Sequence, residues 1–255
     1  MDRLIFTSLS ATTTGSMSRV QLTNDLANVS TTGFKRGFDI RPAAGKLAGP
    51  GFETRYQPVV TDVNNFINLE AGTPYQTDNP LDVSMNGKTV LGVQADDDSL
   101  AFTRRGDLRL SAEGFLETAN GYLVATEGGG PLTVPVGGMI SITPDGTVFF
   151  QADGGLEVPP QQIGQLLLRD ASATTLTRRV DTLFEEIGAG GLGGDIAPGP
   201  EIASLTVGAL EGSNVNPVGA LVSLMDFYRA FETQMKIIKS AEDIDKDATR
   251  LMRAS

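Results

Sequence analysis

The side chains that could carry chemistry in this chain are carboxylates, hydroxyls, lysines and arginines, because its 255 residues include no Cys and no His. Thiolate and imidazole catalysis are therefore excluded, and so are nearly all zinc sites. Asp96-Asp97-Asp98 lacks the ligand spacing of a calcium loop, and Glu185-Glu186 has no second acid for acid–base catalysis. We interpret them as a hairpin tip and a solvated surface. The sequence predicts no enzyme and no catalytic, cofactor-binding or metal-binding residues.

One stretch imitates a nucleotide-binding motif. Residues 188–193 have the sequence G-x-G-x-x-G. This motif binds a dinucleotide only where it follows a strand and precedes a helix whose N-terminus faces the phosphate. Pro198 and Pro200 follow, so we predict a flexible loop.

Charge and hydropathy exclude two further classes of partner. The net charge of −11 argues against a nucleic acid, and the pairs Lys35-Arg36 and Arg104-Arg105 are too small to bind a polyanion. Residues 1–18 lack the apolar stretch of a secretory signal, and no segment approaches the length that spans a bilayer. We therefore expect neither a cleaved signal peptide nor membrane insertion.

The last 37 residues, 217–253, are predicted to form one amphipathic helix. Asn216 can cap the free N–H groups, and Pro217 suits the first helical position. Apolar residues then recur at steps of three and four, which is typical of a coiled-coil seam: Leu221, Leu224, Tyr228, Phe231, Met235 and Ile238. Such a helix is roughly 55 Å long, longer than a compact domain of this chain needs. We therefore expect it to have a partner.

The partner within the chain is predicted at the other end. Residues 1 to about 28 place Ile5, Leu9, Met17 and Val20 on one side of a helix. Serines, threonines and Gly15 crowd the middle of this segment, and each lowers helix propensity. The segment is therefore expected to be helical only when it packs on another element.

The middle of the chain, residues 79–187, alternates apolar and polar residues between turn signals. The clearest signals are Asn86-Gly87 and Asn120-Gly121, which are typical of tight hairpins. Short strands at this spacing predict an antiparallel sandwich or a distorted barrel. We expect an α+β fold with three parts: a paired-helix coiled-coil domain from 1–36 and 213–255, irregular connections at 37–78 and 188–212, and the β-rich domain at 79–187.

Two segments next to the predicted helices have the residue types of sharp corners. Residues 24–36 read NDLANVSTTGFKR, in which Gly33 is free to adopt a left-handed conformation. Residues 210–218 read LEGSNVNPV and lead into the cap at Asn216. The residues that we expect to shape these corners are Asn24, Leu26, Asn28, Gly33, Phe34, Asn214, Asn216 and Pro217.

These segments resemble the bacterial flagellar axial proteins, which comprise rod, hook and hook-associated subunits. The family's N-terminal signature, Asn-Asn-Leu-Ala-Asn followed by Thr-x-Gly-Phe-Lys, is matched from Asn24 to Lys35, except that Asp25 replaces an Asn. Residues 210–218 match closely, and Arg229-Ala230-Phe231-Glu232 is similar to a motif of the family's terminal helix. In the middle, residues 79–83, 102–106 and 114–122 also fit. The resemblance covers nearly the whole chain.

The resemblance implies a structural subunit of the basal-body rod, and the proximal rod subunits are the most similar members. It implies that the terminal helices join copies of this chain and other proximal and distal rod subunits into a hollow drive shaft, which transmits torque and forms the export channel. It also implies delivery by the flagellar type III export apparatus to the periplasmic rod, with no cofactor. The residues at positions 88–91 depart from the family's usual aromatic pair.

Alternatives remain open at this point. Within the family, the chain could be a distal rod or hook subunit. Outside it, a secreted carbohydrate-binding domain or an adhesin-like trimer would also combine a β domain with helical ends. Paired carboxylates in a pocket would favour the first of these, and three-fold closure would favour the second.

Overall fold

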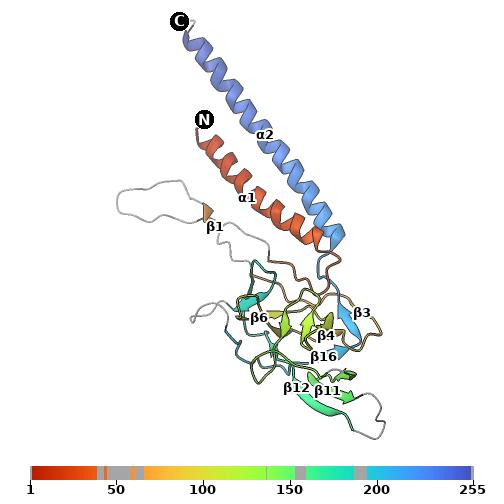
Figure 1. The fold of residues 1–255 in the computed structure, drawn as a ribbon. Helices are drawn as coiled ribbons and strands as arrows, with labels where there is room; N and C mark the ends of the chain where they lie inside the picture. Colours follow the sequence, from red (N-terminus) through yellow and green to blue (C-terminus); the bar gives the residue numbers. More distant parts are fainter. Residues whose placement is uncertain are drawn as a thin grey trace, which may run out of the picture. The chain divides into compact units, whose positions relative to one another are not determined.

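The computed structural model describes residues 2–38, 43–44, 59–60, 66–135, 137–152, 159–186 and 194–253. The chain divides into two compact units, here called the helical unit (1–27, 39–64 and 216–255) and the β unit (28–38 and 65–215). Both are drawn in Figure 1. Most of the predicted connection at 37–78 and the G-x-G-x-x-G stretch lie outside the described residues.

The helical unit is built on two long helices, α1 (Asp2–Ala27) and α2 (Pro217–Arg253). They contact each other along their lengths, and the start of α1 lies beside the later part of α2 (Figure 1). The two short strands β1 (Ala43–Ala44) and β2 (Val59–Val60) pair with each other in the same unit. Both ends of α2 fall at the predicted residues, and the predicted α+β class is confirmed.

The β unit contains antiparallel strands in several ladders. Seven strands of its largest sheet lie in the order β14-β15-β6-β5-β9-β8-β7, and β13 also pairs with β5. The bounds are β5 Thr89–Gln94, β6 Leu100–Thr103, β7 Leu108–Leu110, β8 Leu116–Thr118, β9 Leu123–Val124, β13 Leu168–Asp170, β14 Leu176–Arg178 and β15 Phe184–Glu186. A second sheet has the order β10-β11-β12, with bounds Gly138–Ile142, Thr147–Ala152 and Gln161–Gln165.

Two further ladders join residues that are far apart in the chain. Strand β16 (Leu205–Val207) pairs with β4 (Val83–Met85), and β17 (Ala209–Glu211) pairs with β3 (Pro74–Gln76). Strands β3, β16 and β17 lie in ranges that the sequence predicted to be irregular. Their alternation is too short to be recognised, since each spans three residues.

Most of the predicted turns connect paired strands. Asn120-Gly121 joins β8 to β9, and Asp96-Asp97-Asp98 joins β5 to β6. Asn86-Gly87 is also a turn, because the Thr89 N–H donates to the Asn86 carbonyl over 3.0 Å. The hairpin predicted there is wrong, however: β4 pairs with β16, and β5 pairs with β6, β9 and β13. A local turn signal determines where the chain reverses direction, but it does not determine which strand pairs with the strand before the turn.

The core of the β unit consists of aliphatic residues that face inward from both sheets. Its largest cluster includes Leu91, Leu116, Val124, Val148 and Leu166, each fully buried. A second cluster is centred on Phe102, Val90 and Leu176. Arg104 of the site described below directly follows β6, the strand that contributes Phe102 to the second cluster.

Candidate assembly site

The two helices of the helical unit pack closely at a glycine. A Cβ atom added to Gly15 would lie 2.9 Å from the ring of Phe227, so the missing side chain lets the aromatic ring approach α1. Nearby, the Thr12 hydroxyl donates to the side-chain oxygen of Gln234 over 3.2 Å. Gly15, which weakens α1 as an isolated helix, therefore serves its packing.

The buried stripe of α2 is offset from the predicted seam. Its less exposed residues are Ala220, Leu224, Phe227, Gln234, Ile238 and Ala241, and their spacing is close to that of a heptad. The stripe includes Phe227, which lies against Gly15, and Gln234, which bonds to Thr12. Of the predicted seam, Leu224 and Ile238 belong to this stripe, whereas Leu221, Tyr228, Phe231 and Met235 are exposed. The predicted seam thus lies along one edge of the buried stripe.

A second apolar surface of α2 is left open in the single chain. Here called the exposed face, it comprises Val218, Leu221, Val222, Met225, Tyr228 and Met235, which are 45 to 69% exposed. Ile237 and Ile244 are also exposed, but helical geometry places them on the other flank of the buried stripe. A run of large apolar side chains in water is typical of a surface that another protein covers.

The end of α2 also extends past α1 (Figure 1). Because Thr12 lies opposite Gln234 and the helices run in opposite directions, the start of α1 reaches about residue 244 of α2. The last turns of α2 therefore have no α1 residue opposite them.

The start of α2 has the predicted cap. The Asn216 side-chain oxygen accepts a hydrogen bond from the Gly219 N–H over 3.0 Å. The predicted pairs on the helix surface are also present: Lys236 lies 2.9 Å from Glu232, and Lys246 lies 2.6 Å from Glu242. All four of these charged groups are largely exposed, so the pairs add little to stability.

In the β unit, the predicted corner after residue 28 turns at Gly33. Its φ is +67°, as the sequence predicted, and its N–H donates to the Glu211 carbonyl over 2.7 Å. A Cβ atom at this position would lie 2.4 Å from the Arg104 carbonyl oxygen. Glycine is therefore required twice, by backbone conformation and by close contact.

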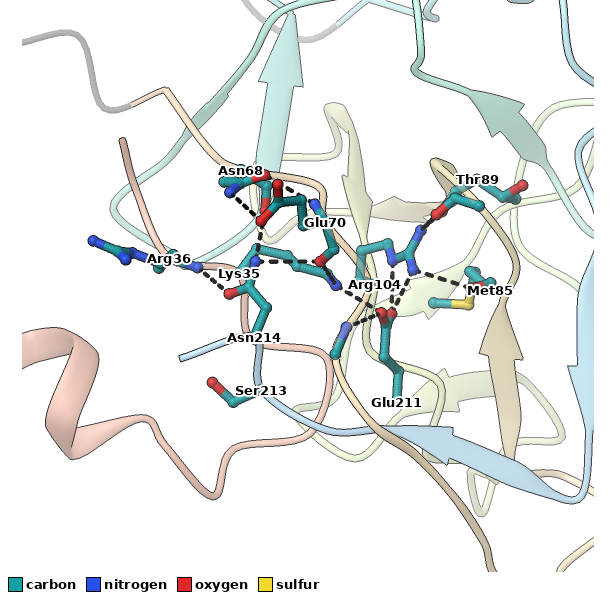
Figure 2. A network of polar contacts seen from close by, with 12 residues as sticks. Lys35, Arg36, Asn68, Glu70, Met85, Thr89, Arg104, Glu211, Ser213 and Asn214 are labelled. Atoms are coloured by element: carbon teal, nitrogen blue, oxygen red, sulfur yellow. Dashed lines mark hydrogen bonds and ion pairs between the residues drawn. The ribbon is translucent and has the colours of Figure 1, made fainter. Parts of the chain in front are cut away.

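A buried ion cluster, here called the triad, consists of Lys35, Arg104 and Glu211 (Figure 2). The Lys35 Nζ atom lies 2.6 Å from Glu211 Oε1, and the Arg104 Nη2 atom lies 2.6 Å from Glu211 Oε2. The side chains of Lys35 and Arg104 are 0% exposed, and that of Glu211 is 2% exposed. Three segments distant in the sequence meet here.

The other hydrogen bonds of the triad go to the backbone. Arg104 donates to the carbonyls of Met85, Gly87 and Thr89 over 2.7 to 3.0 Å, and Lys35 donates to that of Glu70 over 2.7 Å. Glu211 Oε1 also accepts the Gly72 N–H over 2.9 Å. Hydrogen bonds and ion pairs of this kind are what allow charges to remain buried.

Burial and, to a smaller extent, the neighbouring Arg104 charge lower the pKa of Lys35 from 10.5 to about 8, and this value already includes the opposing effect of Glu211. Lys35 therefore keeps most of its charge at pH 7, and the triad holds two cations and one anion.

Asn214 ties the same corner together through its amide (Figure 2). Its Oδ1 atom accepts the Arg36 N–H over 2.7 Å, and its Nδ2 atom donates to the carbonyls of Asn68 and Glu70 over 2.9 and 3.2 Å. One side chain thus satisfies backbone groups from two segments.

Phe34 lines a cavity of about 220 Å³ in the β unit, together with Asn28, Tyr122 and other residues. The Arg178 guanidinium lies 4.5 Å from the centre of the Phe34 ring, in a cation–π contact. Asn28 accepts hydrogen bonds from Thr31 through both its carbonyl and its side chain. These contacts hold the corner together after residue 28.

The remaining predicted site residues are spread over different environments. In α1, Met17 and Leu26 are half-buried, Val20 and Asn24 are exposed, and the side chains of Ile5 and Leu9 lie outside the described residues. Asn216 and Pro217 are exposed at the start of α2.

Sequence reasoning missed the triad. It treated Lys35 and Arg104 as members of small basic pairs and gave Glu211 no role. Each of the three does lie in a segment that carries the family resemblance, and this was the available signal. The Asp96–Asp98 prediction is confirmed, because these residues form the exposed turn between β5 and β6.

The described residues include no group of three Asp or Glu side chains placed to hold a metal ion. Neither of the two helices, over the residues described, has the length and apolar character needed to cross a bilayer.

Comparison with known proteins agrees with this architecture. Residues 206–251 match the family described as flagellar basal body rod FlgEFG protein C-terminal, and residues 84–150 match the flagellar hook protein FlgE/F/G D1 domain. The flagellar basal-body rod protein FlgF of Salmonella typhimurium is 32% identical over 257 aligned residues, covering all of both chains. FlgF of Escherichia coli is 31% identical, again over all of both chains. FlgG of Caulobacter vibrioides is 30% identical over 90% of this chain and 92% of its own.

The fold and these matches define a structural protein rather than an enzyme. The chain belongs to the flagellar basal-body rod FlgE/F/G family, whose members serve bacterial motility, and it is FlgF-like.

Proposed function

We propose that this chain is a proximal-rod subunit of the FlgF type, which polymerises through its terminal helices into the hollow shaft of the basal body. Full-length coverage of two FlgF relatives supports this sub-type over the distal rod. The shaft transmits torque and encloses the export channel. The partners are copies of this chain and the other rod proteins.

The observation that carries the assembly is the exposed face of α2. One stripe of this helix packs on α1, and a second apolar surface remains in water. Burying one large aliphatic side chain contributes about 1.5–3 kcal/mol, so several together favour association strongly. Head-to-tail contacts that do not close into a ring build a helical shaft.

We also propose that the chain reaches the periplasmic rod unfolded, through the flagellar type III export apparatus. Two features support passage of an unfolded chain. It contains no cysteine, so its folding requires no disulfide. The serine, threonine and glycine residues of α1 weaken that helix until it packs.

Charged substitutions on the exposed face test the assembly. Leu221→Glu and Met225→Glu place a carboxylate on this surface without changing the stripe that packs on α1. We expect both variants to be secreted normally but to be absent from purified basal bodies, and swimming in soft agar to be lost. Immunoblots of the culture medium and of basal bodies separate secretion from incorporation.

Ser223→Glu is the matched control, because Ser223 is exposed on the same helical turns but is not apolar. It should be incorporated and should restore swimming. Normal incorporation of Leu221→Glu and Met225→Glu would contradict assembly through this surface.

A further inference from the structure

The triad contains more positive than negative charge. Lys35 and Arg104 are both completely buried, and Glu211 is the carboxylate that pairs with each of them. Their other partners are the backbone carbonyls described above. Backbone dipoles reduce the penalty of burying two like charges but cannot cancel the charges.

The residue that supplies the negative charge comes last in the chain. Glu211 follows Lys35 by 176 positions and Arg104 by 107 positions. It ends β17, which pairs with β3 and follows directly after β16, the partner of β4. In the sequence, therefore, all of the β unit except its last four residues, 212–215, is complete by the time Glu211 supplies the negative charge of the triad.

We propose that Glu211 acts as a clasp: the β unit closes around Lys35 and Arg104 only after β17 has brought the Glu211 carboxylate between them. A chain from which residue 211 is still missing would have to bury Arg104 without a counter-ion and to bury Lys35 either unpaired or stripped of its proton, and both outcomes cost stability. Such a chain does not complete the core around Lys35 and Arg104, so the β unit folds fully only once its final strand, β17, is in place.

Further contacts of Glu211 connect the clasp with the backbone. Its carbonyl accepts the Gly33 N–H over 2.7 Å, and its Oε1 atom accepts the Gly72 N–H over 2.9 Å. Placing β17 therefore orders the corner at Gly33 and the segment at Gly72 in one step. The inference concerns folding of the β unit alone and does not depend on the proposed place in the rod.

The test is urea unfolding of the full-length chain. The transition is monitored by the tyrosine band of the near-ultraviolet circular dichroism spectrum, to which Tyr122 of the β unit contributes, since its ring is half-buried and its hydroxyl donates to the Asp181 carbonyl. The variants are Glu211→Gln, Lys35→Met and the double variant Lys35→Met/Glu211→Gln. Glu211→Gln keeps the shape of the side chain but leaves the two buried basic groups, Lys35 and Arg104, without an anion. It should lower the urea midpoint by about 1 M or more.

The double variant separates charge balance from the loss of contacts. It removes more contacts than Glu211→Gln but leaves one buried basic group without an anion instead of two, so its midpoint should lie above that of Glu211→Gln. Lys35→Met retains the neutral pair of Arg104 and Glu211 and should have the highest midpoint of the three. Glu211→Gln could be too unstable to show a cooperative transition. In that case a cooperative transition in the double variant supports the clasp, and the absence of a cooperative transition in the double variant overturns the proposal.

Glu117→Gln is the matched control. Glu117 also lies on a strand and pairs with an arginine, Arg109, at 2.7 Å, but Arg109 is 58% exposed. Its midpoint should change by about 0.5 M or less. A midpoint for Glu211→Gln no lower than that of Glu117→Gln, or a double variant no more stable than Glu211→Gln, would overturn the proposal.

Discussion

Gly33 provides the most local prediction. Gly33→Ala would force an L residue to φ +67° and bring its Cβ to 2.4 Å from the Arg104 carbonyl oxygen. We expect the free energy of unfolding of the β unit to fall by about 2–4 kcal/mol, the sum of left-handed strain and overpacking. Chemical denaturation measures this change.

Gly208→Ala is the control for that substitution. Gly208 has a similar φ of +73°, but a Cβ there would have no neighbour within 4 Å. It should lose only about 1–2 kcal/mol, the strain of the left-handed conformation. Equal losses at the two positions would show that the contact with Arg104 is unimportant.

Lys35 gives a prediction for pH. Its pKa is about 8 in the folded chain and 10.5 ordinarily, so between these values the unfolded chain binds a proton that the folded chain does not. The free energy of unfolding must therefore rise with pH over this window, by about 3 kcal/mol in total. The charges facing Lys35 in the triad are Arg104 and Glu211.

Lys35→Met shows whether the rise belongs to Lys35. The difference in unfolding free energy between wild type and this variant should be constant between pH 6 and 7 and should shift in favour of the wild type from about pH 8 to 10. A difference that does not change with pH over this range would contradict the lowered pKa.

At the scale of single residues, the sequence predicted what depends on local backbone chemistry. Gly33 was found because a glycine after Thr-Thr signals a left-handed turn, and Asn216 was found because its side chain caps the residues that follow. The triad could not be found in this way, because no local pattern indicates that Lys35, Arg104 and Glu211 share one interior.

At the scale of elements, α2 offers a comparison between its two faces. Phe227→Ala would remove the ring that lies against Gly15 and stacks on Phe231 at a centroid distance of 6.1 Å. We expect it to lower the thermal midpoint of the helical circular dichroism signal, because large-to-small changes at packed aromatic residues cost about 3–5 kcal/mol.

Met225→Ala should leave that midpoint unchanged or raise it slightly, because Met225 is 56% exposed and alanine is the better helix former. Equal effects of the two substitutions on the monomer would show that the helices are not packed through Phe227.

The length and ends of α2 were predictable because capping and periodicity act within a few residues. The phase of its buried stripe was not, because α2 is apolar on more than one side. The side that packs on α1 includes Phe227, whose ring lies against Gly15. The pairing of β4 with β16 was also unpredictable, because it depends on contacts between distant strands rather than on the residues of a turn.

At the scale of the whole molecule, the chain is a structural protein whose two ends supply one unit and whose middle supplies another. The exposed face of α2 gives the single chain an apolar surface in water, which we propose other rod subunits cover. The clasp gives its β unit an interior that only a late segment can neutralise. These two features concern assembly and folding, and neither requires a catalytic group.

The sequence by itself determined the helices, the turns, the absence of cysteine and histidine chemistry and the family resemblance. Each of these depends on residue types or on interactions between neighbours in the chain. The tertiary structure alone decided which face of α2 is buried, which strand pairs with β4, and that Lys35, Arg104 and Glu211 meet. These outcomes depend on packing between segments up to 176 residues apart, where no local spacing carries information.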